Sequence, residues 1–102
     1  MKYATQEEYW VDPESSKLRY EFEQLHQDFE DPWGCSMEFN SLSNRLFMEL
    51  IFPPGRKYKN ILDLGCGQGY LTNRIKLRNL GGVVTGVDCS VTAVNKAKNT
   101  FP

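Results

Sequence analysis

Three glycines and two aspartates are the residues whose types and spacing could bind a nucleoside. The turn Gly65-Cys66-Gly67-Gln68-Gly69 follows an apolar run at residues 61–64 and precedes a helical pattern at residues 70–78. A strand, a glycine turn and a helix in this order bring backbone N–H groups beside a bound ligand. The pattern therefore predicts a ligand site at the turn.

A carboxylate lies on each side of this turn. Asp63 stands two residues before the first glycine, and Asp88 ends a second predicted strand at residues 83–88. An acid about twenty residues beyond such a turn can accept both hydroxyls of a ribose. Asp63 would repel a pyrophosphate but not a ligand that carries an ammonium group. These residues favour a nucleoside ligand with a positive charge and no pyrophosphate.

The glycine spacing differs from that of two common phosphate-binding turns. The dinucleotide fingerprint is Gly-x-Gly-x-x-Gly, whereas this sequence has Gly-x-Gly-x-Gly. The Walker pattern also fails, because no Gly-Lys-Ser/Thr follows. A nicotinamide-dependent dehydrogenase is therefore a disfavoured alternative.

The segments 63–69 and 84–90 resemble the first two cofactor motifs of class I S-adenosylmethionine-dependent methyltransferases. The resemblance implies S-adenosylmethionine as cofactor, with the glycine loop around its methionine part and Asp88 on its ribose hydroxyls. Asp63 would orient the loop or meet the amino group. The residues that the resemblance assigns to the cofactor site are Asp63, Gly65, Cys66, Gly67, Gly69, Asp88 and Cys89. The alternative is an ordinary strand-to-helix turn in which Asp88 caps a helix.

A second, weaker resemblance is to the quinone-biosynthesis O-methyltransferases and the nodulation N-methyltransferases. It depends on the segment Asp31-Pro32-Trp33-Gly34 and on Arg45, which stands twenty residues before Gly65. By this resemblance Arg45 would pair with the cofactor's carboxylate, which suits a guanidinium fork. Trp33 would help to cover the pocket, and the methyl acceptor would be a small molecule.

Helical periodicity predicts two helices before the first strand. Ser15 or Ser16 would cap the first helix, and the polar face of that helix would lie in solvent. Prolines at 53 and 54 would end the second helix. The apolar stripe of the first is Leu18, Phe22, Leu25 and Phe29, and its polar face is Glu21, Glu23, Gln24 and Gln27. The stripe of the second is Phe39, Leu42, Leu46 and Leu50, widened by Phe47 and Ile51.

Two more helices are predicted in the second half of the chain. The first of them would place Leu71 and Ile75 against the sheet and end near Asn79. Ser90 would cap the second. The inward face of that last helix would be Val91, Val94, Ala97 and Phe101.

The predicted fold class is α/β, the start of a Rossmann-like methyltransferase sheet with two parallel strands. Residues 1–14 are expected to be a flexible arm. Residues 15–102 would be the N-terminal part of the domain, with a helical preface at 15–55 and a β-α-β-α cofactor unit at 59–102. Later strands of the family's sheet would lie beyond residue 102, so we expect a fragment, an isoform or a truncated product. Open sheet edges favour self-association.

Composition limits the partners, the cellular location and the chemistry that the chain can be expected to have. The 102 residues have a net charge of −1, so bulk charge does not indicate nucleic acid or a membrane as partner. No apolar run has the length of a membrane span, and the acidic N-terminus is unlike a signal peptide, so a cytoplasmic location is expected. The three cysteines and single histidine do not predict a metal site. His26 is expected to be at the surface or half-buried, and no catalytic residue is predicted. A non-catalytic chain that binds another protein is the alternative function.

Overall fold

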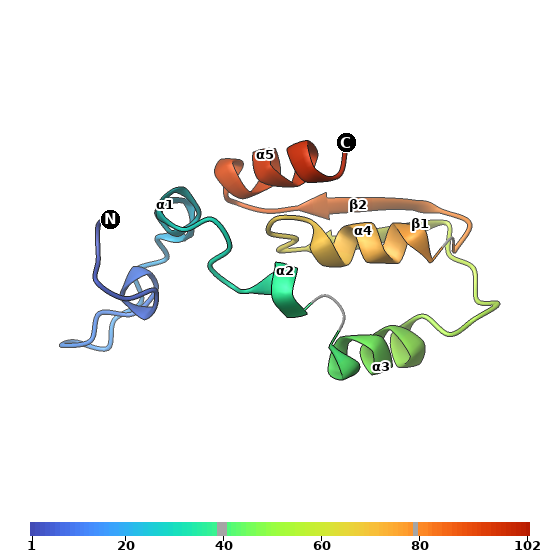
Figure 1. Ribbon diagram of the computed structural model, residues 1–102, viewed down its shortest axis with the longest axis horizontal. Helices are drawn as coiled ribbons and strands as arrows, with labels where there is room; N and C mark the ends of the chain where they lie inside the picture. The colour runs from blue at the N-terminus through green and yellow to red at the C-terminus, as the bar shows by residue number, and fades with distance from the viewer. Residues whose placement is uncertain (39–40, 79) are drawn as a thin grey trace.

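The computed structural model describes residues 1–38, 41–78 and 80–102, and its centre is a pair of parallel strands (Figure 1). Strand β1 (Asn60–Leu64) pairs with β2 (Val83–Val87), with Asn60 opposite Val83 and Leu64 opposite Val87. Helix α4 (Tyr70–Leu77) follows β1, and α5 (Val91–Thr100) follows β2. This β-α-β-α order confirms the α/β class and both predicted strands.

The two faces of the sheet differ in burial. Ile61 and Val84 lie on the covered face, where they pack with Ile75 of α4 in a small core that also holds Met48 and Leu80. The opposite face exposes four apolar side chains among the described residues, namely Leu62, Leu64, Val83 and Val87. Parallel sheets are normally covered on both faces, so this surface is unusually apolar.

Four short elements precede the sheet. They are the 3₁₀ helix η1 (Glu7–Tyr9) and the helices α1 (Phe22–Asp28), α2 (Cys35–Glu38) and α3 (Leu42–Ile51). The expected helices are present as α1 and α3, with α2 between them. The cap predicted at Ser15 or Ser16 is wrong, because α1 begins only at Phe22. Ser16 and Tyr20 have positive φ angles, and Leu18 forms an antiparallel bridge with Val11, so this segment cannot be helical.

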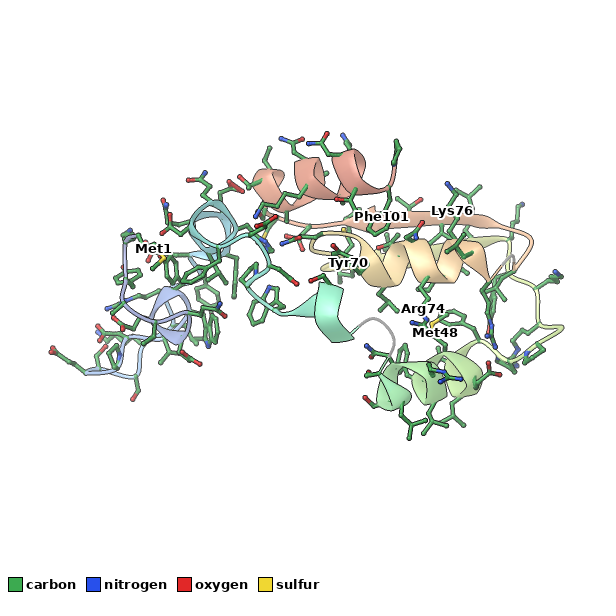
Figure 2. The ribbon with its side chains drawn as sticks, viewed as in Figure 1. Met1, Met48, Tyr70, Arg74, Lys76 and Phe101 are labelled. Atoms are coloured by element: carbon green, nitrogen blue, oxygen red, sulfur yellow. The ribbon has the colours of Figure 1, made fainter. Side chains whose placement is uncertain are left out.

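Helix α3 forms where predicted, with Ser41 as its N-cap, but its predicted apolar stripe does not face a core. Leu46 is 53% exposed and Leu50 is 80% exposed. Met48 is buried instead and lies between α3 and α4, beside Arg74 (Figure 2). Phe39, the first residue of the stripe, lies outside the described residues, as does Asn79 near the end of α4.

Helices α1 and α5 cap each other. The Glu23 carboxylate of α1 accepts hydrogen bonds from Ser90 Oγ (2.7 Å), Thr92 N (2.8 Å) and Thr92 Oγ1 (2.6 Å) at the start of α5. In return, Lys96 Nζ of α5 donates to the carbonyl oxygens of His26 (2.6 Å) and Phe29 (2.8 Å) at the end of α1. These charges lie at the helix ends that they stabilise. The prediction that Glu23 belongs to a solvated face is therefore wrong.

This contact explains two further corrections. His26 is only 3% exposed, not at the surface, and burial lowers the pKa of its imidazole. On α5, Ser90 is the N-cap as predicted and accepts a bond from Ala93 N at 3.0 Å. Ala93 is fully buried, whereas Val91, predicted to face inward, is exposed. The packing of α1 against the start of α5 determines which side chains of α5 are buried there.

The N-terminal segment packs on α1. Tyr9 is fully buried, and its ring lies edge-on to those of Tyr3 and Phe29. Its hydroxyl donates to Asp28, and this bond is the main reason that the Asp28 pKa falls to about 2.

No helix in the described part of the chain is both long enough and apolar enough to cross a bilayer.

Candidate cofactor-binding site

The glycine turn joins β1 to α4 and is tied to the end of β2. Gly65 N and Cys66 N both donate to the carbonyl oxygen of Val87, at 2.8 and 2.9 Å. Gly65, Gly67 and Gly69 all have positive φ angles, of 74°, 54° and 83°. Side chains rarely adopt this backbone conformation, so the geometry of the turn requires the three glycines.

Asp88 connects the second strand to this turn. Its Oδ2 accepts a hydrogen bond from Gly67 N at 2.8 Å, and its Oδ1 accepts one from Ser90 N at 2.8 Å. The carboxylate is thus fixed between the glycine turn and the start of α5. Each oxygen keeps capacity for one more donor, because a carboxylate offers about four acceptor positions.

The Asp63 carboxylate is held by a hydrogen bond from α4. Thr72 Oγ1, in the first turn of α4, donates to Asp63 Oδ2 at 2.6 Å. This bond fixes the carboxylate beneath the glycine turn while leaving Oδ1 without a described protein donor. Thr72 was not foreseen as a site residue, although a hydroxyl three residues into the helix after the turn is a recognisable signal.

The turn and the preface enclose a cavity of about 310 Å³. Six predicted site residues line this cavity: Trp33, Asp63, Gly65, Cys66, Gly67 and Asp88. Gly69 is instead the N-cap of α4, and a Cβ at this position would lie 3.0 Å from that of Ala97. Cys89 is exposed and is not part of the lining. Arg45 is on the exposed side of α3, in a separate hollow with Arg74 and Arg78.

Sequence reasoning missed several lining residues. They are Asp31, Cys35, Gln68, Tyr70 and Leu71. Asp31 accepts hydrogen bonds from the backbone N–H groups of Cys35 (3.1 Å) and Ser36 (3.0 Å), and Gln68 Nε2 donates to the Glu30 carbonyl (2.5 Å). Gln68 could have been inferred from its place between two motif glycines. Asp31 could not be inferred from local sequence, because it lines the cavity only through the packing of the preface beside the turn.

The cavity is acidic. Three carboxylates line it, those of Asp31, Asp63 and Asp88, and none of the described lining residues is Lys, Arg or His. Burial, and then the nearby Asp88 and Asp63, raises the pKa of the Cys66 thiol, so this thiol stays protonated at neutral pH. The cavity therefore suits a ligand with a positive charge and groups that can donate hydrogen bonds.

Gly86 allows the close packing on which this geometry depends. A Cβ at this position would lie 2.9 Å from Cys66 Cβ and 3.1 Å from Thr72 Oγ1. We expect Gly86→Ala to displace the turn and to weaken ligand binding by about tenfold, with a loss of about 1–3 kcal/mol in unfolding free energy from overpacking. Calorimetric titration and urea unfolding measure the two effects. Gly55→Ala is a control for the binding measurement alone, because Gly55 lies away from the cavity but its φ of 86° makes alanine strained there. Equal binding by the two variants would contradict the expectation.

Comparisons with known proteins agree with this geometry. Residues 56–101 match the family described as a methyltransferase domain. The ubiquinone biosynthesis O-methyltransferase of Coxiella burnetii is 38% identical over 79 residues, which are 76% of this chain and 32% of that protein. The putative methyltransferase 235L of Invertebrate iridescent virus 6 is 32% identical over 70 residues, 69% of this chain and 26% of that protein. No solved structure matches the chain significantly.

The βαβα unit, its glycine turn and these matches identify the chain as a member of the class I methyltransferases. The similarity to a ubiquinone biosynthesis O-methyltransferase also agrees with the second, weaker resemblance seen in the sequence. The chain spans between a quarter and a third of the length of the curated relatives that it matches.

Proposed function

We propose that this chain forms the cofactor-binding part of an S-adenosylmethionine-dependent methyltransferase that acts on a small molecule. One observation carries the proposal: Asp63, Asp88 and the glycine turn line the same acidic cavity. The volume of about 310 Å³ lies within the range of small-molecule sites. The name of the Coxiella relative supports a small-molecule acceptor.

The residues of the cavity fit this cofactor. S-adenosylmethionine supplies a methyl group that its sulfonium makes electrophilic. Asp88 would accept the ribose hydroxyls with the acceptor positions that Gly67 N and Ser90 N leave open. Asp63 would attract the ammonium group or the sulfonium. In this proposal Arg45 pairs with the ligand's carboxylate only after α3 moves toward the turn, because it now lies in a separate hollow.

Calorimetric titration with S-adenosylhomocysteine tests the proposal, since this product lacks the reactive methyl group but keeps the nucleoside and the amino acid. We expect saturable one-to-one binding, and we expect NAD, the matched control, not to bind. Absence of binding at millimolar S-adenosylhomocysteine would sink the proposal. Tighter binding of NAD would favour a dehydrogenase instead.

A second candidate is a non-catalytic chain that binds another protein. The observation that favours it is the exposed apolar surface of α3 and of the open sheet face, which includes Leu46, Leu50, Leu62, Leu64 and Val83. Exposed apolar surface of this kind commonly marks an interaction site. The titration above separates the two candidates, because a chain that only binds proteins has no need of the cofactor.

The same surface leads to a prediction about assembly. We expect the isolated chain to self-associate, because the outer edges of β1 and β2 and one face of the sheet are uncovered. Sedimentation velocity over a range of concentrations measures this, and the sedimentation coefficient should rise with concentration. A Leu62→Lys variant should shift the distribution toward monomer. A tight monomer at all concentrations would contradict the expectation.

The proposal includes a cytoplasmic location. Cys66 and Cys89 form no disulfide, and a reducing compartment keeps thiols in this state.

A further inference from the structure

Trp33 forms an aromatic wall of the cavity and does not stand alone. It lines the cavity with 46% of its surface exposed, in a turn between α1 and α2. Its indole stacks on that of Trp10, with ring centroids 5.0 Å apart and planes at 27°. Phe22, the first residue of α1, lies 6.4 Å from it on a tilted plane. Trp33 therefore contacts rings from two segments that precede it in the chain.

The backbone around Trp10 is firmly held. Trp10 N donates to Glu7 O at 3.1 Å, and Arg19 N donates to Trp10 O at 2.8 Å. The next peptide toward the N-terminus is fixed by Glu21 N, which donates to Tyr9 O at 2.9 Å. Tyr9 itself is fully buried against α1. Trp10 thus presents its indole from a backbone that is hydrogen-bonded on both sides.

The Trp33 backbone lies in a sharp turn between Pro32 and Gly34, whose φ is 66°. Asp31 closes this turn by accepting bonds from Gly34 N at 3.1 Å, Cys35 N at 3.1 Å and Ser36 N at 3.0 Å. These backbone bonds do not fix the orientation of the Trp33 indole. The stacked Trp10 ring limits the orientations open to it.

We propose that Trp10 is a positioning residue of the ligand site: it holds the Trp33 indole against the cavity, where this ring faces a cationic nucleoside ligand. The proposal rests on the proposed function and adds the N-terminal segment to the site. An aromatic face attracts a sulfonium or ammonium group, and this attraction supplements that of the three carboxylates. Without Trp10, Trp33 loses its fixed orientation, and the cavity opens to water.

Binding measurements on the 102-residue chain test this role. We expect Trp10→Ala to weaken S-adenosylmethionine binding by about tenfold, and Trp10→Phe to restore most of it because a phenyl ring can still stack. Tyr20→Ala is the control, since this ring belongs to the same segment but is 68% exposed. Calorimetry supplies the affinities, and far-UV circular dichroism shows whether each variant is folded.

Fluorescence tests whether Trp33 lies at the ligand, as the proposed role of Trp10 requires. Trp10 and Trp33 are the two tryptophans of the chain, so Trp10→Phe leaves Trp33 as the single indole. Its emission should be quenched or shifted by S-adenosylmethionine, with the midpoint that calorimetry gives. Unchanged emission while the ligand binds would overturn the proposal, as would equal affinities of Trp10→Ala and Tyr20→Ala. If the parent chain binds no ligand, the proposed function itself fails, and this proposal fails with it.

Discussion

Replacing Asp88 with alanine should reduce cofactor binding by roughly 100-fold or more. The substitution removes an ionised acceptor that would receive two ribose hydroxyls, and bonds to charged groups contribute about 1.5–3 kcal/mol each. It also releases Gly67 N and Ser90 N, which both donate to this carboxylate at 2.8 Å. Calorimetric titration with S-adenosylhomocysteine measures the loss. Unchanged affinity would contradict the role of Asp88 in ribose binding.

Two further variants separate ligand contact from local folding. Asp88→Asn removes the charge and keeps one of the two backbone bonds, because its amide nitrogen cannot accept the other N–H. It should disturb the turn less than Asp88→Ala and still bind more weakly than the parent. Glu14→Ala removes an exposed carboxylate that does not line the cavity, and it should bind like the parent. If Glu14→Ala weakened binding as much as Asp88→Ala, a general charge effect would explain both results.

Replacing Glu23 with alanine should destabilise the fold by about 2 kcal/mol, a value reduced for the partial solvent access of the carboxylate. The carboxylate accepts three bonds from Ser90 and Thr92 and a fourth from Gln27 at 2.9 Å. Its loss leaves the first turn of α5 without this cap and weakens the contact between α5 and α1, where the bonds from Lys96 remain. Urea unfolding followed by circular dichroism measures the change. Glu14→Ala should leave the midpoint unaltered, and a similar loss in this control would argue against the cap.

The same carboxylate makes stability depend on pH. Hydrogen bonds from the Thr92 hydroxyl, then from Thr92 N and Ser90, lower the Glu23 pKa from 4.5 to about 2. A carboxyl with a lowered folded pKa stabilises the fold above its unfolded pKa, and this contribution is lost as pH falls from about 4.5 toward 2. Asp28, with a pKa of about 2, acts in the same range. The parent should therefore lose stability more steeply than Glu23→Gln in this range, and parallel curves would contradict the role of Glu23.

The parts that local sequence determines could be predicted. The apolar runs that form β1 and β2, the glycines between β1 and α4, and the Ser90 cap each depend on residues within a few positions of one another. These elements brought Asp63, Asp88 and the turn together as expected. Six of the nine predicted site residues consequently line one cavity.

The remainder depends on contacts between distant segments. Leu18 continues a helical stripe in the sequence, yet it pairs with Val11 because residues 11–18 fold back on themselves. Glu23 has the spacing of a solvent-facing residue, but packing against α5 gives it three hydrogen-bond donors from Ser90 and Thr92. Met48 is outside the apolar stripe of α3 but is the residue that meets α4. Periodicity identifies a helix, but it does not reveal which neighbour the helix will meet.

The mutual capping of α1 and α5 also constrains the order of folding. The bond between Glu23 and Thr92 joins residues 69 positions apart, and the bond between Lys96 and His26 joins residues 70 apart. Such contacts form slowly, because closing a long loop costs chain entropy before any bond can compensate. We therefore expect the contact between α1 and α5 to form late in folding, with His26 exposed to solvent until it does.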